Sequence, residues 1–71
     1  SGETDKLSEI IAYLEDEDYT MRITAVNTFS EIRNNENKEV LLSAVKNRLK
    51  AENSEAVKAS IEEFVNKVEE I

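Results

Sequence analysis

Carboxylates are the side chains of this chain with the greatest capacity for chemistry, and they are densest in the run Glu-Asp-Glu-Asp at residues 15–18. Clustered carboxylates are the ligands that calcium prefers in proteins. The spacing does not match a calcium loop, because counting Asp16 as the first ligand places Met21 where the loop needs glycine and Asn27 where it needs a bidentate glutamate. We therefore expect no metal site, and we interpret residues 15–18 as a solvated turn that could also attract a basic partner.

Carboxylate pairs could also serve acid–base catalysis, but the groups that usually accompany them are missing. The 71-residue sequence contains no histidine and no cysteine, so it has neither imidazole nor thiolate chemistry. A chain of this length also offers no deep pocket in which a carboxylate would lose its water. We expect no enzymatic activity and no cofactor.

The charge of the chain favours a basic or mixed-charge protein surface as its partner. The formal net charge is −7 at pH 7, whereas nucleic acids and anionic membranes bind proteins mainly through neutralisation of their own negative charge. A group of basic residues, with no aromatic residue or glycine interleaved, is formed by Lys38, Lys46, Arg48 and Lys50. We expect this group to complement the acidic first helix, and we do not expect nucleic acid as a partner.

The sequence carries no sign of a membrane or secretory protein. No apolar run reaches the roughly 20 residues that cross a bilayer, and no basic and then apolar segment opens the chain. We expect a cytoplasmic or nuclear protein that is not secreted. Ser1 and Gly2 look like the remnant of a cleaved tag, so residues 1–3 are expected to lie outside the folded domain.

Apolar residues recur at the helical period of 3.6 in four segments. They predict four helices, over residues 4–15, 19–33, 38–51 and 54–71. Thr4, Asp18 and Ser54 are the expected N-caps of the first, second and fourth helices. The connections of two to five residues predict that consecutive helices run antiparallel.

The chain repeats itself at a spacing of 35 residues. The correspondences include Leu7 with Leu42, Leu14 with Leu49, Glu17 with Glu52 and Phe29 with Phe64. A fixed period of this size is typical of repeat proteins, whose units must stack to bury their apolar faces. We therefore predict an all-α fold, a fragment of an α-solenoid in which two antiparallel helical hairpins, residues 4–34 and 37–71, stack into the single domain 4–71. Phe29 and Phe64 are expected at equivalent buried positions.

The turn within the first hairpin has a recognisable pattern. Acidic Asp18 is followed by apolar Met21, basic Arg22 and small Ala25, and then by Phe29 and Ile32 along the helix. This pattern resembles the HEAT repeat. Residues 53–58 supply a counterpart with one extra residue, so the resemblance spans residues 7–68. It implies a right-handed helical scaffold for protein interactions, with the second helix of each hairpin lining a concave surface.

Arg22 falls within the apolar arc of its helix, where an unpaired charge is costly. The resemblance implies a pair with a turn acid, so we expect a structural ion pair between Arg22 and Asp18, four residues earlier. The alternative is that the Arg22 side chain reaches solvent at the edge of the apolar stripe.

The polar sides of the two second helices form the candidate partner-binding surface. Its residues are Thr24, Asn27, Thr28, Glu31, Glu55, Glu62, Asn66 and Glu69. Such residues are equally common on an ordinary solvated face. Their combined acidic character favours a role in holding a basic peptide or helix.

Two functions remain open from the sequence. The first is a non-enzymatic interaction module or scaffold that binds a basic or mixed-charge protein surface. The second is a structural assembly unit that forms a homodimer or stacks on neighbouring repeats through its apolar ends. Ile71 favours the second function, because it continues the apolar phase of Phe64 and Val68 where a terminal repeat normally carries a polar face.

Overall fold

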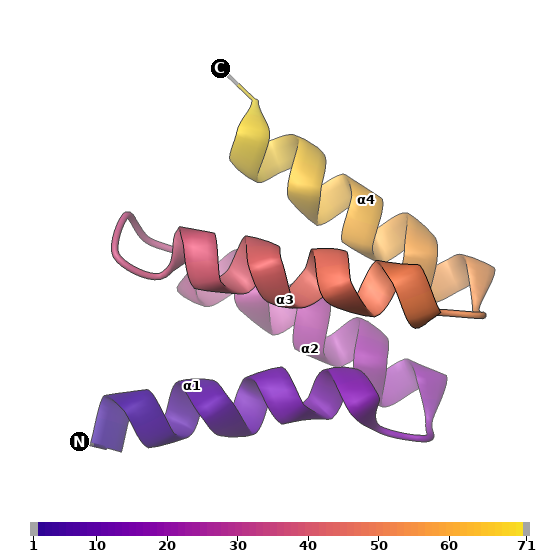
Figure 1. The fold of residues 1–71 in the computed structure, drawn as a ribbon, viewed down its shortest axis with the longest axis horizontal. Coiled ribbons are helices and arrows are strands. Elements are labelled where there is room, and N and C mark those ends of the chain that lie inside the picture. The colour runs from indigo at the N-terminus through magenta and orange to yellow at the C-terminus, as the bar shows by residue number, and fades with distance from the viewer. Residues whose placement is uncertain (1, 71) are drawn as a thin grey trace.

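The computed structural model of the chain describes the backbone of residues 2–70 and the side chains of residues 6–70. Within this part of the chain the fold is all-α, as predicted, and contains no strand (Figure 1). Its elements are α1 (Gly2–Ala12), the short 3-10 helix η1 (Tyr13–Glu15), α2 (Tyr19–Ile32), α3 (Lys38–Ala51) and α4 (Glu55–Glu69).

The helix boundaries agree closely with those expected from the sequence, except at the amino terminus. The bounds of α3 match, α2 ends one residue early, and the first predicted helix is divided into α1 and η1, whose tighter winding is common where a helix ends. α1 begins at Gly2, so the expectation that Thr4 caps this helix is wrong and Thr4 lies inside it. Ser1 and Ile71 lie outside the described residues.

Local hydrogen bonds to side chains begin two of the helices. Asp18 caps α2, because its carboxylate accepts a hydrogen bond from the backbone N–H of Thr20 at 2.9 Å. Ser54 caps α4 in the same way, accepting from the N–H of Val57 at 3.3 Å. These contacts satisfy backbone donors that have no partner within the first helical turn.

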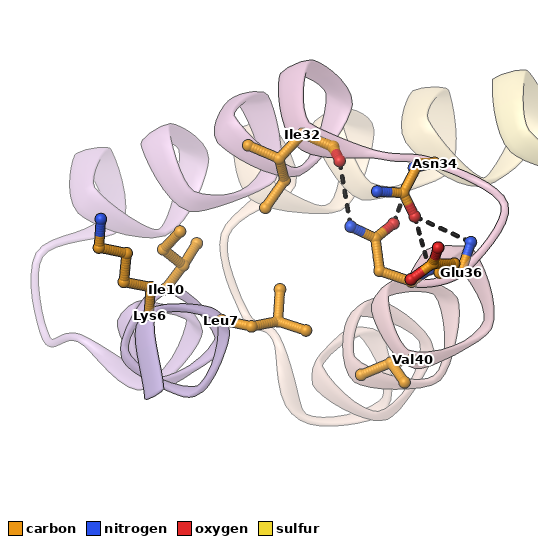
Figure 2. A pocket seen from close by; sticks show the side chains of 8 residues that line it. Lys6, Leu7, Ile10, Ile32, Asn34, Glu36 and Val40 are labelled. Atoms are coloured by element: carbon orange, nitrogen blue, oxygen red, sulfur yellow. Dashed lines mark hydrogen bonds between the residues drawn. The ribbon is translucent and has the colours of Figure 1, made fainter. Parts of the chain in front are cut away.

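The polar connection between α2 and α3 folds through its own asparagines (Figure 2). The Oδ1 atom of Asn34 accepts hydrogen bonds from the N–H groups of Glu36 and Asn37, both at 2.8 Å. Asn37 closes the loop, because its Oδ1 accepts from the N–H of Asn34 at 2.8 Å and its Nδ2 donates to the carbonyl of Ile32 at 3.0 Å. The loop therefore ends α2 and starts α3 without help from other elements.

The core lies where the two hairpins meet. Its fully or nearly fully buried residues are Leu14, Ala25, Val26, Phe29, Leu41, Leu42, Val45, Val57, Ile61 and Phe64. The rings of Phe29 and Phe64 meet edge to face with centroids 6.1 Å apart, an arrangement that aromatic pairs prefer. The prediction that both phenylalanines are buried, Phe29 in α2 and Phe64 in α4, is confirmed.

The helices form a flattened body whose shortest extent is 18 Å, about two helix diameters. α2 and α4 make the most extensive contact between elements, α3 packs against α4, and η1 packs against α2. Figure 1 shows consecutive helices running back and forth across the molecule, with α4 inclined to the others. The turns at residues 16–18 and 52–54 lie at one end of the molecule, and the loop between α2 and α3 lies at the other.

Candidate functional site

A buried carboxylate, Glu52, is the centre of the polar network in this fold. Its side chain is fully buried in the turn between α3 and α4. It accepts hydrogen bonds from Nε and Nη2 of Arg22, both at 2.9 Å, from Nε of Arg48 at 3.0 Å and from the backbone N–H of Ser54 at 2.9 Å. The two bonds from Arg22 form a bidentate pair, the strongest geometry available to arginine and carboxylate.

Arg22 is buried and paired, but its partner differs from the one that we expected. Its guanidinium binds Glu52, and its Nη1 also donates to the carbonyls of Asp16 at 2.6 Å and Glu17 at 3.2 Å. The predicted ion pair with Asp18 is therefore corrected, because the Asp18 carboxylate is turned toward Thr20 to cap α2. Asp18 contributes to Arg22 only an electrostatic attraction that is weaker than those of Glu52 and Asp16.

Arg48 extends the network to the first hairpin. Its Nη1 lies 2.9 Å from Oε1 of Glu15, and its Nη2 donates to the carbonyl of Ala51 at 3.3 Å. Arg22 of the first hairpin thus binds a carboxylate of the second, and Arg48 of the second hairpin binds a carboxylate of the first. The expected charge complementarity with the acidic first helix is confirmed for Arg48.

The network shifts the titration of its members. Burial of the Glu52 carboxyl raises its pKa, but the hydrogen bonds from Arg22, Ser54 and Arg48 together outweigh burial and lower the pKa to about 2. The hydrogen bond to Glu52 raises the pKa of Arg22, against the opposing effect of burial. Glu52 and Arg22 therefore stay charged at neutral pH, and the role of the network is structural.

The predicted partner-binding residues lie at the surface with one partial exception. Thr28 is half-buried, and the other seven are exposed. The hydroxyls of Thr24 and Thr28 donate to backbone carbonyls of their own helix at 2.9 Å, so these protons are already used within α2. The two threonine hydroxyls are therefore less available to donate hydrogen bonds to a ligand than their exposure implies.

Ion pairs neutralise part of the negative charge of this surface. Glu55 lies 3.3 Å from Nζ of Lys58, and Glu69 lies 2.8 Å from Nζ of Lys46. Within residues 6–70, Glu31 and Glu62 take part in no ion pair. They are the carboxylates of the predicted surface that are best able to bind a cation.

An open groove of about 710 Å³ is a feature that the sequence did not predict. Its apolar lining is Leu7 and Ile10 from α1, Ile32 from α2 and Val40 from α3 (Figure 2). Leu7 and Ile10 pack against the core but are only half-buried, so each also contributes to the groove. Val40 lies outside the apolar stripe of α3. An apolar residue in that position was the one feature of the sequence that could have indicated the groove.

A smaller depression of about 370 Å³ gathers Arg33, Lys38 and Lys67 around the loop between α2 and α3. Arg33 directly follows α2, and Lys67 lies in the last turn of α4. Positive charge is favourable at both places because helix carboxyl ends carry partial negative charge. Their position is thus explained by helix stability.

The described residues contain no group of three or more metal-ligating side chains placed to hold an ion. In the same part of the chain, no helix combines the length and apolarity needed to cross a membrane. Comparison with protein families, with curated proteins and with solved structures gives no match to this chain. Its function must therefore be inferred from its own residues and geometry.

Proposed function

We propose that this chain is a non-enzymatic protein-interaction module that binds a basic or mixed-charge partner. The binding surface, which we name the α2/α4 surface, consists of Thr24, Asn27, Thr28, Glu31, Glu55, Glu62, Asn66 and Glu69. The observation that carries the proposal is the packing behind this surface. α2 and α4 make the largest contact in the fold and bury Phe29 and Phe64 between them, so their outward residues stand on a rigid support.

Electrostatics supports a basic partner. The chain carries a net charge of −7, which attracts cations over several ångströms and raises the rate of encounter. Glu31 on α2 and Glu62 on α4 are exposed carboxylates without an ion pair among the described residues. Lysine or arginine side chains of a partner helix or peptide would supply the missing positive charge.

We also propose that the two hairpins stack as HEAT-like repeats, which would place α2 and α4 on one side as the lining of a shared surface. The equivalent residues Phe29 and Phe64 meet in the core, as they would in adjacent units of a stack. In addition, Arg22 of the first hairpin holds Glu52, the counterpart of Glu17 at the spacing of 35 residues. An arginine that links one turn to the next is a means of fixing neighbouring units in register.

The proposal is tested with a synthetic lysine-rich amphipathic helical peptide labelled with a fluorophore. We expect the parent chain to bind this peptide, and binding to weaken as salt is added. The double variant Glu31→Lys and Glu62→Lys should lose this binding while keeping its helical circular dichroism, because both residues are exposed.

The matched control is the double variant Glu9→Lys and Glu39→Lys, which alters two exposed acids of α1 and α3 and changes the net charge by the same amount. We expect it to retain most of the affinity. If the two double variants weaken binding equally, the peptide responds only to overall charge and the α2/α4 surface is not a binding site.

A further inference from the structure

The groove leaves apolar side chains partly exposed at the end of the molecule that holds the loop between α2 and α3. Val40 retains 48% of its accessible surface, and Leu7, Ile10 and Ile32 are each only half-buried. Figure 2 shows the Leu7 side chain pointing from α1 toward α3, the helix that bears Val40. Apolar side chains gathered at one open groove are available for contact with another molecule.

The groove lies where the two hairpins are least tied together. The network of Arg22, Glu52 and Arg48 joins them at the end that holds the two turns, and η1 makes the contact with α3 there. The groove is at the opposite end, where α1 begins and the loop between α2 and α3 crosses (Figure 1). A molecule that packs against the apolar residues of the groove would therefore add contacts to both α1 and α3.

The charges at the margins of the groove are opposite in sign. Lys6 lies on the α1 side and Glu36 on the side of the loop between α2 and α3, and both are exposed (Figure 2). Within residues 6–70 neither takes part in an ion pair. A two-fold symmetric contact brings the same patch of two copies face to face, so that a residue i meets j and j meets i. Such a contact can satisfy Lys6 and Glu36 twice.

We propose that a second copy of this chain occupies the groove. In this dimer the apolar residues around Val40 pack on their counterparts, and each Lys6 pairs with Glu36 of the partner subunit. The α2/α4 surface contributes no residue to the groove lining and stays open in both copies. The dimer would then carry two surfaces for one partner, and a partner with two basic segments would bind with increased avidity.

The first test measures molar mass in solution by sedimentation equilibrium over a wide range of concentration. We expect the mass to rise from that of one chain toward that of two. Val40→Glu should weaken association by at least about tenfold, because it removes a central apolar contact and adds a charge that must lose its water. The substituted residue is exposed, so the thermal melt of the single chain should change little.

Tyr19→Glu is the matched control, since Tyr19 is similarly exposed, at 51%, but begins α2 at the other end of that helix. It should associate like the parent chain. A mass of one chain at every concentration overturns the proposal, and so does equal weakening by Val40→Glu and Tyr19→Glu.

Charge reversal provides the second test. Lys6→Glu and Glu36→Lys should each weaken association several-fold, and the two together should restore it. Glu36→Lys reduces the net negative charge, which by itself favours association, so weakening by this variant identifies a local contact. The double variant has the same net charge as the parent chain, and failure to restore association contradicts the two-fold pairing.

The effect of salt distinguishes dimerisation through the groove from peptide binding at the α2/α4 surface. Both copies carry a net charge of −7, so screening reduces their mutual repulsion while it also weakens the exposed Lys6–Glu36 pairs, and the apolar contact should keep the dimer within a few-fold of its strength at low salt. Peptide binding should weaken under the same conditions. Loss of the dimer in high salt would contradict an apolar contact between copies, whatever the result at the α2/α4 surface.

Discussion

Replacement of Glu52 by glutamine is expected to destabilise the fold severely, because it leaves the buried charge of Arg22 without its main partner. Arg22 retains 7% of its accessible surface and points two N–H groups at the Glu52 carboxylate. A glutamine has one carbonyl oxygen and would turn its own NH₂ group toward these donors. Breaking a buried ion pair from one side typically costs about 3–5 kcal/mol.

The depressed pKa of Glu52 gives a magnitude of the same order. Its pKa falls from 4.5 to about 2 in the folded chain, although burial acts in the opposite direction. A shift of this size corresponds to about 3 kcal/mol at 1.36 kcal/mol per pKa unit. This is an upper limit, because the side chains of Arg22 and Arg48 remain slightly exposed and solvent screens part of the interaction. A chain of 71 residues has a total stability of only about 4–11 kcal/mol, so the loss is a large fraction.

Urea unfolding followed by circular dichroism measures this effect. We expect Glu52→Gln to lower the free energy of unfolding more than Arg22→Met does, since loss of Arg22 leaves Glu52 bound to Arg48 and to the N–H of Ser54. The combined variant should be less destabilised than the sum of the two, because the pair is coupled. Equal and additive losses would refute the assignment of Glu52 as the centre of the network.

Acid gives an independent check of the same reasoning. The folded pKa of Glu52 is depressed, so its contribution is fully present above pH 4.5 and is lost as the pH falls toward 2. The parent chain should therefore lose more stability across this window than Glu52→Gln does. The other carboxylates are common to both chains and cancel in the comparison, so identical losses would show that Glu52 is not held by these hydrogen bonds.

Two further substitutions test the core and the helix starts. Phe29→Ala should cost about 3–5 kcal/mol, since Phe29 is fully buried against Phe64, and a thermal melt close to that of the parent chain would show that the aromatic pair is not central. Ser54→Ala should cost about 1 kcal/mol by removing the acceptor of the Val57 N–H, and an unchanged urea midpoint would mean that this cap does not stabilise α4.

The helices could be predicted from the sequence because their signals are local. The apolar period places the stripes, and Asp18 and Ser54 stand directly before α2 and α4, where their side chains accept from the first turn. The start of α1 was misplaced because Thr4 is a residue type that favours N-caps, and no apolar residue precedes Leu7 to show that the helix begins earlier.

The partner of Arg22 could not be predicted, because it depends on tertiary structure. Asp18 is four residues away and has the favourable spacing for a pair within one helix. Its carboxylate was already committed to the N–H and hydroxyl of Thr20, and the guanidinium reaches across to Glu52, 30 residues later. Periodicity did identify Arg22 as a charge inside an apolar arc, which is why a paired state was expected.

The groove could not be predicted either, because it also depends on tertiary structure. A helical stripe shows that Leu7 and Ile10 face inward, but it does not show whether a neighbouring helix covers them. The charged network draws the hairpins together at the end that holds the turns, and the loop between α2 and α3 is stabilised by its own asparagines at the other end. Because that loop needs no contact with α1, no described hydrogen bond or ion pair links α1 and α3 beside Leu7 and Val40. The apolar surface left there is available to a second copy, whereas the opposite end is already satisfied by Arg22, Glu52 and Arg48.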